Sequence, residues 1–116
     1  MTEETSRCPD DPVSFIRSHV AESKVLWTYH ASMRLARRTL TRADVFAAAA
    51  GFELVEAYPD DKYFPSYLVL GVAEAGPIHV LVATDVEGDN VRIITAYRPD
   101  PAEWEADMRT RRKKKP

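Results

Sequence analysis

Three stretches decide the fold of this chain: Tyr67-Leu-Val-Leu-Gly-Val-Ala73, Ile78-His-Val-Leu-Val-Ala-Thr84 and Val91-Arg-Ile-Ile-Thr-Ala-Tyr97. Each is short, apolar and bounded by turn residues, which is the pattern of a β-strand. A fourth strand is predicted over Phe52–Tyr58, where the turn signal Pro59-Asp-Asp follows. Short turns at Ala75-Gly-Pro and Glu87-Gly-Asp-Asn90 join the other three. Because such short connections join antiparallel neighbours, the sequence predicts an antiparallel sheet.

Helix signals precede the strands. Asp11-Pro12 predicts a helix start, with the aspartate as N-cap and the proline at the first helical position. A second helix is expected after Thr28, and Thr41-Arg-Ala-Asp44 has the pattern of a capping box for a third helix that ends near Gly51. Pro101–Met108 is predicted as a final helix. We therefore expect an α+β fold, with N-terminal helices packed on a four-stranded antiparallel sheet and a short C-terminal helix.

The length of 116 residues fits one domain, which we predict over residues 11–108. Residues 1–10 are expected to be disordered, and residues 109–116 form a basic C-terminal tail. The tail holds six of the 16 basic residues and no acidic one, so the body has ten basic against 18 acidic side chains. Such a tail can contact phosphates or serve as a solubilising end. The acidic body restricts any contact with nucleic acid to a local basic site.

Several classes of protein are excluded or disfavoured by composition. No apolar run reaches the roughly 18 residues of a membrane span, so no membrane partner is expected. Cys8 is the only cysteine, which excludes an internal disulfide and fits a cytoplasmic location. Three histidines and one cysteine show no metal-ligand spacing, and four glycines form no phosphate-binding loop. We therefore expect no metal and no cofactor.

The second predicted helix carries a cluster of basic residues. His30 and Arg34 are four residues apart and share one helical face, which Arg37 and Arg38 continue one turn later. Arginine side chains bind phosphate oxygens as a fork, and an imidazole transfers protons, so this face is a candidate phosphate clamp. The alternative is a solvated basic face, or arginines paired with carboxylates of the acidic body.

The last two strands carry the second group of candidates. Thr95 and Tyr97 have the same parity and point to one face of the sheet. His79 lies inside an apolar strand, and Arg98 follows the last strand, where Pro99 fixes the exit of the chain. Binding groups commonly sit where rigid elements end. The alternatives are a satisfied core histidine, a β-branched strand threonine and a core tyrosine whose hydroxyl reaches the surface.

Several motifs together resemble those of the small bacterial proteins catalogued as domain of unknown function 4258. The motifs are His30-xxx-Arg34-xx-Arg37, Val55-Glu-Ala-Tyr58-Pro-Asp-Asp, Pro65-Ser-Tyr-Leu68, Leu70-Gly, Pro77-Ile-His79-Val and Ile94-Thr95-Ala-Tyr97-Arg98-Pro99-Asp100. The resemblance covers roughly residues 25–112. That family is similar to the RelE-like and barnase-like ribonuclease toxins, which pack helices on a curved antiparallel sheet and often accompany an antitoxin. The resemblance thus implies a metal-independent endoribonuclease, or a descendant of one.

The resemblance also implies roles for individual residues. His30 would be an acid or base, and Arg34 a phosphate ligand. Tyr97 would be a second proton-transfer or stacking group, with Thr95 orienting it. Arg98 or Arg38 would stabilise the developing charge. The reaction would be attack of a ribose 2′-hydroxyl on the adjacent phosphate.

The remaining candidates would bind the substrate. Arg37, Arg38, His79 and Arg98 form this substrate-binding group. RNA bases would stack on exposed aromatic rings, with Tyr63, Phe64 and Tyr67 as candidates.

Two functions of different classes follow from the sequence. The first is a cytoplasmic ribonuclease toxin of a toxin–antitoxin pair, with RNA and a cognate antitoxin protein as partners. The alternative is a catalytically silent protein-binding module of the same fold, which would hold its partner through the sheet edge or the basic tail. A small-molecule or metabolic role is the third possibility.

Overall fold

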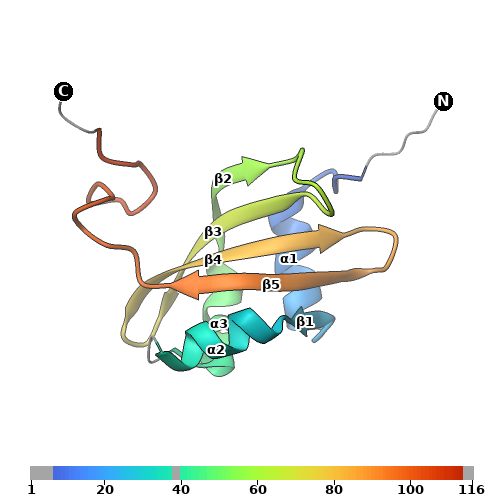
Figure 1. Ribbon diagram of the computed structural model, residues 1–116, viewed down its shortest axis with the longest axis horizontal. Helices are drawn as coiled ribbons and strands as arrows, with labels where there is room; N and C mark the ends of the chain where they lie inside the picture. Colours follow the sequence, from blue (N-terminus) through green and yellow to red (C-terminus); the bar gives the residue numbers. More distant parts are fainter. Residues whose placement is uncertain (1–6, 38–39, 114–116) are drawn as a thin grey trace.

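A five-stranded sheet forms the centre of the molecule in the computed structural model, which describes residues 7–37 and 40–113 (Figure 1). The strands lie in the order β1-β5-β4-β3-β2. Their bounds are Val25–Trp27 for β1, Glu53–Tyr58 for β2, Ser66–Ala73 for β3, Gly76–Asp85 for β4 and Asn90–Tyr97 for β5. Strands β2 to β5 are antiparallel neighbours, as predicted, and each lies within two residues of its expected range.

The prediction of a four-stranded antiparallel sheet was wrong in one respect. The short strand β1 adds a fifth strand, and it pairs with β5 in parallel, with Val25 opposite Val91 and Trp27 opposite Ile93. Three residues are too few to show the alternation that identifies a strand. Strand β1 forms because the backbone of β5 pairs with it, and β5 lies next to it only in the folded chain.

The three α-helices begin where their capping residues predict. Helix α1 (Pro12–Ala21) is capped by Asp11, whose carboxylate accepts from the Ser14 N–H. Helix α2 (Tyr29–Arg37) follows Thr28, whose hydroxyl accepts from the Ala31 N–H. Helix α3 (Arg42–Ala48) has the complete capping box of Thr41 and Asp44. It continues into the 3-10 turn η1 (Ala49–Gly51).

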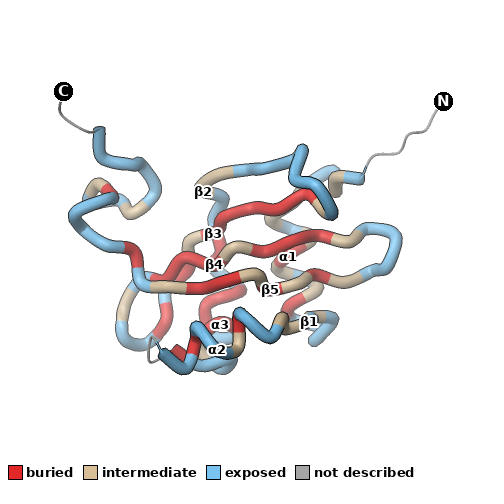
Figure 2. The backbone as a smooth tube through the Cα atoms, viewed as in Figure 1, coloured by how far each residue is buried: buried red, intermediate tan, exposed pale blue. Residues whose placement is uncertain are grey.

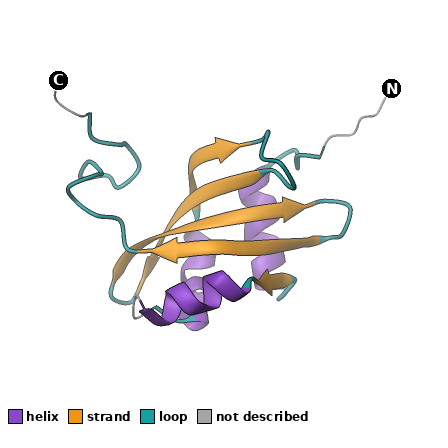
Figure 3. Cartoon of the chain, in the orientation of Figure 1, coloured by secondary structure: helices purple, strands orange, loops and turns teal. Residues whose placement is uncertain are grey.

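All three helices pack on one face of the sheet (Figure 3). The buried core between the layers combines Ile16 and Val20 of α1, Ala31 and Leu35 of α2, Val45 and Ala48 of α3, and Val69, Val80, Val82, Ile93 and Ala96 of the sheet. Figure 2 shows the buried residues concentrated along the central strands. None of the helices within the described ranges is long and apolar enough to cross a membrane.

The opposite face of the sheet, which we call the outer face, is partly covered by the end of the chain. Residues 103–112 form a hairpin there, closed by a bridge between Trp104 and Arg111 and by the bond from the Arg112 N–H to the Glu103 carbonyl, at 2.9 Å. We call this segment the C-terminal hairpin. Its Trp104 side chain is almost fully buried.

The predicted C-terminal helix over Pro101–Met108 is therefore wrong. The chain makes one turn after Asp100, whose carbonyl accepts from the Glu103 and Trp104 N–H groups at 2.8 and 3.1 Å. It then reverses at Asp107 and Met108, where the Asp107 carboxylate accepts from the Arg109 N–H and Met108 has a φ of 59°. Burial of Trp104 against the sheet overrides the helix propensity of this stretch.

Candidate functional site

The outer face gathers the strand residues that the sequence singled out. His79 on β4 is opposite Tyr97 on β5, and Leu81 is opposite Thr95. Because side chains alternate along a strand, these four side chains project from the same face. The prediction that Thr95 and Tyr97 share a face is confirmed. The core helices pack on the other face, and on this face His79 contacts Met108 and Trp104 of the C-terminal hairpin.

His79 is fully buried beneath the C-terminal hairpin. Its Nε2 lies 2.6 Å from the Met108 carbonyl oxygen, and its Nδ1 lies 3.2 Å from the Tyr97 hydroxyl. A carbonyl oxygen only accepts, so Nε2 carries the proton and Nδ1 accepts from Tyr97. The Trp104 ring meets the imidazole edge-on, with ring centroids 4.5 Å apart.

Burial lowers the pKa of His79 below its ordinary value of 6.5. The Met108 carbonyl and the nearby Glu56 carboxylate oppose this effect, and Arg111 reinforces it. At neutral pH the imidazole is therefore uncharged and holds a lone pair toward Tyr97. The Tyr97 phenol can thus give its proton to Nδ1 of His79, and the Met108 carbonyl holds the imidazole in the tautomer that leaves Nδ1 free of a proton.

A cavity of about 340 Å³ opens beside this pair, lined by Tyr58, Asp61, Leu68, Leu81, Thr95, Tyr97 and Arg111. Thr95 and Tyr97 thus reach the cavity directly, whereas His79 lies behind Tyr97. Its walls supply two phenols, a hydroxyl, a carboxylate and a guanidinium over an apolar floor. This combination can orient a polar ligand by a few groups and exclude water with the rest.

Arg111 enters the cavity from the C-terminal hairpin and was not predicted. It binds Glu56 on β2 with two bonds, from Nε to Oε2 at 2.6 Å and from Nη2 to Oε1 at 3.1 Å. Its guanidinium carbon lies 4.6 Å from the centroid of the Trp104 ring. The Tyr58 hydroxyl donates to the same carboxylate. A fork of this kind fixes the cation in one orientation.

The charges of this group stabilise one another. The bonds from Arg111 hold the pKa of the Glu56 carboxyl below its ordinary value, and the carboxylate in turn raises the pKa of Arg111. Partial burial and then the Glu56 carboxylate raise the pKa of the Tyr58 phenol. The sequence showed Arg111 only as part of a basic tail, and the fold alone reveals its partner.

The basic residues of the second predicted helix lie elsewhere. His30, Arg34 and Arg37 are exposed on α2, which runs beside β5 at the edge of the sheet (Figure 1). The residues that line the cavity of Tyr97 include none of the described residues of α2. Arg98 is exposed just beyond β5. Arg38 lies outside the described residues.

The structure thus brings together Thr95, Tyr97 and His79, and it adds Arg111 and Glu56 to them. It places the basic residues of α2 along the neighbouring edge. Among residues 7–37 and 40–113, no three His, Cys, Asp or Glu side chains gather in a way that could hold a metal ion.

Comparison with known proteins gives one match. No curated protein and no solved structure is significantly similar to the chain, so the expected likeness to ribonuclease toxins stays a prediction. The model of the family described as domain of unknown function (DUF4258) matches residues 27–98. This range is more than half of the chain and contains Glu56, His79, Thr95 and Tyr97, while Arg111 follows it. The protein therefore belongs to the DUF4258 family.

Proposed function

We propose that this protein cleaves RNA without a metal ion, as the toxin of a toxin–antitoxin pair. One observation supports this proposal most directly. The Tyr97 hydroxyl lines a cavity and donates to the buried, uncharged imidazole of His79, while a guanidinium from Arg111 lines the same cavity. A proton-transfer pair can activate a ribose hydroxyl, and a fixed cation can stabilise the charge that develops on the phosphate.

The steps follow from the hydrogen bonds. The Tyr97 oxygen takes the proton of the ribose 2′-hydroxyl as its own proton passes to His79 Nδ1. The 2′-oxygen attacks the adjacent phosphorus and the bond to the 5′-oxygen breaks, which leaves a 2′,3′-cyclic phosphate. The leaving oxygen takes a proton from water, and His79 then returns its proton to solvent through Tyr97. Arg111 binds a non-bridging phosphate oxygen, and Thr95 positions the Tyr97 ring.

The exposed cations of α2 complete the proposal. Arg34 and Arg37 would bind phosphates of the RNA strand beside β5, because α2 runs along that edge. His30 would contribute a second proton-transfer group. These roles depend on an RNA that extends from the cavity over the sheet edge, so they are tested separately from Tyr97.

The test is RNA cleavage in EDTA by the wild type and by Tyr97→Phe, with detection of cyclic phosphate ends. The phenylalanine keeps the ring and removes only the hydroxyl, and we expect the rate to fall about a hundredfold or more. Tyr29→Phe is the matched control, because it removes the hydroxyl of an exposed tyrosine outside the cavity, and it should cleave as the wild type does. His30→Ala tests the contribution of α2.

Cleavage that persists in Tyr97→Phe would reject the site. Absence of cleavage by folded wild type, with several RNAs and with ribosomes, would reject the ribonuclease. The protein itself should arrest growth when induced, and Tyr97→Phe should relieve that arrest.

A second function, a catalytically silent protein-binding module, is favoured by one specific observation. Both ring nitrogens of His79 are hydrogen-bonded, and the residue is fully buried, so it already has a complete structural role. A module of this kind would bind its partner without cleaving RNA and would not arrest growth. Partner binding that survives combined His30→Ala and Tyr97→Phe changes would favour it over the ribonuclease.

A further inference from the structure

A second cavity, of about 510 Å³, lies on the outer face next to the cavity of Tyr97. Its walls include Thr28, Lys62, Phe64, Arg92 and Ile94. Asp61 lines both cavities. It belongs to the loop of residues 59–65 between β2 and β3, which therefore forms the common wall of the two cavities. Thr95 and Ile94 are consecutive on β5, and they line the first and the second cavity respectively. The two cavities therefore lie one after the other along β5.

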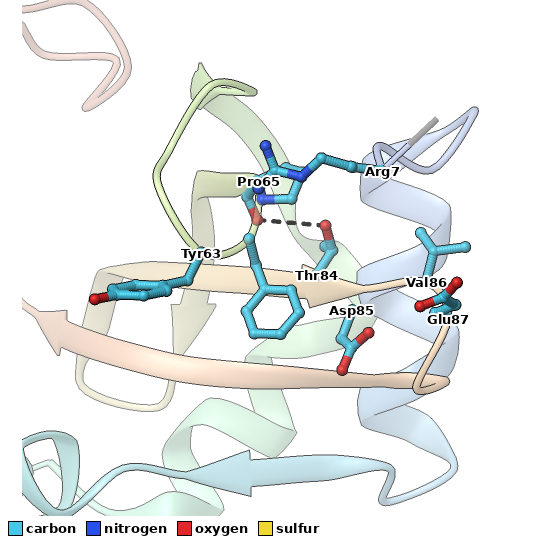
Figure 4. A pocket seen from close by; sticks show the side chains of 8 residues that line it. Arg7, Tyr63, Pro65, Thr84, Asp85, Val86 and Glu87 are labelled. Atoms are coloured by element: carbon cyan, nitrogen blue, oxygen red, sulfur yellow. Dashed lines mark hydrogen bonds between the residues drawn. The ribbon is translucent and has the colours of Figure 1, made fainter. Parts of the chain in front are cut away.

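Aromatic rings form one side of the second cavity. Tyr63 is 78% exposed, the highest exposure among the large hydrophobic residues that the structure describes, although its loop is anchored to the sheet. Figure 4 shows its ring extended over the sheet, away from the end that carries Val86 and Glu87. Phe64 lies beside it, and the Arg92 guanidinium carbon is 4.5 Å from the centroid of the Phe64 ring. An exposed ring on an anchored loop offers a stacking surface at little cost in entropy.

The loop is held by contacts at both of its ends. The Ser66 hydroxyl donates to the Asp61 carboxylate, and the Thr84 N–H donates to the Pro65 carbonyl at 2.9 Å. The Thr84 hydroxyl also donates to that carbonyl (Figure 4). Both Ser66 and Thr84 are fully buried. The rings of Tyr63 and Phe64 thus project from a segment that the sheet holds in place.

Two cations accompany these rings. Lys62 Nζ lies 5.5 Å from the centroid of the Tyr63 ring, and Arg92 flanks Phe64. Arg92 donates from Nη2 to the Asp85 carboxylate and from Nε to the Asn90 side-chain oxygen, both at 3.5 Å, the long limit of a hydrogen bond. These bonds are weak, so an anion at closer range can compete for the guanidinium. Asp61 is the carboxylate of this cavity, and the Ser66 hydroxyl is directed at it. Aromatic rings interleaved with cations are the composition of a single-strand nucleic-acid site.

We propose that the second cavity is a subsite for one unpaired nucleobase of the RNA, next to the phosphate that is cleaved. The base stacks on Tyr63 and Phe64, and its flanking phosphate binds Lys62 and Arg92. This inference rests on the proposed ribonuclease function and adds its substrate class, single-stranded RNA. A duplex is disfavoured, because its bases are stacked on one another and cannot reach a side wall.

The test measures binding with a probe that cannot be cleaved. A labelled, single-stranded 2′-O-methyl oligoadenosine has no free 2′-hydroxyl to attack, and adenine has a large stacking face. We expect Tyr63→Ala to weaken its binding about tenfold and Tyr63→Phe to preserve it, because the ring is what matters. Phe64→Ala should weaken binding as well. Val72→Ala, which shortens an exposed apolar side chain of β3 that lines neither cavity, is the control and should bind as the wild type.

Three results would overturn the subsite: no binding by the wild type, equal binding by the wild type and Tyr63→Ala, or equal binding of the probe and of its duplex. Cleavage assays on the same variants separate the two proposals. If Tyr97→Phe loses cleavage while Tyr63→Ala binds and cleaves normally, the ribonuclease stands and the subsite fails. If Tyr63→Ala alone loses binding and no protein cleaves RNA, the subsite stands and the ribonuclease fails.

Discussion

His79 shows how one buried residue can join the sheet to the end of the chain. It accepts from Tyr97 on β5 and donates to Met108 in the C-terminal hairpin. The bond from Tyr97 requires an uncharged imidazole with no proton on Nδ1, whereas the bond to Met108 requires only the proton on Nε2. A proton on Nδ1 would leave a buried charge and would turn the acceptor of the Tyr97 hydroxyl into a donor.

This environment makes stability depend on pH. Burial lowers the pKa of His79 in the folded state, so between 6.5 and that lower value the unfolded chain binds more protons. Stability therefore rises with pH in this window and falls as the pH drops below about 6.5. Urea unfolding at pH 7.5 and 5.5 should show this loss in the wild type. The loss should be smaller in His79→Gln, even though that variant is less stable throughout.

His30→Gln is the control for this measurement, because His30 is exposed on α2. It should lose as much stability on acidification as the wild type. An equal acid loss in His79→Gln would show that another group is responsible.

Gly71 permits close packing between β3 and the helical layer. A Cβ atom built at this position would lie 2.7 Å from the Phe52 ring and 2.9 Å from the Ala48 side chain, both of them buried. We expect Gly71→Ala to reduce the free energy of unfolding by about 1–3 kcal/mol through overpacking. Gly51→Ala is the matched control, since its Cβ would meet nothing within 4 Å. Urea midpoints compare the two, and equal midpoints would contradict the packing argument.

At the scale of elements, the C-terminal hairpin depends on Trp104. Its ring is buried between His79 and Arg111. We expect Trp104→Ala to release the hairpin while the sheet stays folded, since the loss of a large buried ring removes about 3–5 kcal/mol. Trypsin should then cleave after Arg109 and Arg111 sooner than in the wild type, with little change in far-ultraviolet circular dichroism.

Trp27→Ala is the control for hairpin release. Trp27 is half-buried on β1, near Phe46 and Arg42 of α3, and does not belong to the hairpin contacts described above. Its loss should lower overall stability without selective cleavage at the hairpin. Hairpin cleavage at the wild-type rate in Trp104→Ala would show that the arginine pairs suffice to hold the segment.

The elements also show what the sequence could predict. Strands β2 to β5 were found because apolar runs between turn signals identify strands locally. Alternation then placed Thr95 and Tyr97 on one face. The sequence missed two elements for a common reason. Strand β1 forms only because it pairs with β5, and the C-terminal hairpin forms only because Trp104 is buried against the sheet. Neither partner is near in sequence, so no local pattern records it.

The candidate site divides in the same way. The strand patterns of the sequence were enough to predict His79, Thr95 and Tyr97 as candidate site residues. Arg111 was grouped with the basic tail, since its pairing with Glu56 spans 55 residues. The motif Val55-Glu-Ala-Tyr58 did contain the carboxylate, but nothing in the sequence connected it with the arginine.

For the whole molecule, charge is distributed more evenly than the sequence suggests. Of the predicted tail, Arg109 pairs with Glu53, Arg111 with Glu56 and Arg112 with Glu105. These arginines therefore offset carboxylates of the body and leave a weaker positive field at that end. The proposed binding of RNA should accordingly depend on local cations and stacking more than on long-range attraction.

The parallel pairing of β1 with β5 has a consequence for the time course of folding. Residue 25 must find residue 91, so this edge closes the longest loop in the sheet. The hairpins β2–β3, β3–β4 and β4–β5 close much shorter loops, and short loops close sooner. A ribosome makes β1 before β5, so β1 has no strand to join until β5 has emerged. Strand β1 can therefore pair only after β5 has been made. Until then the apolar side chains of β1 stay exposed to solvent, where they favour aggregation.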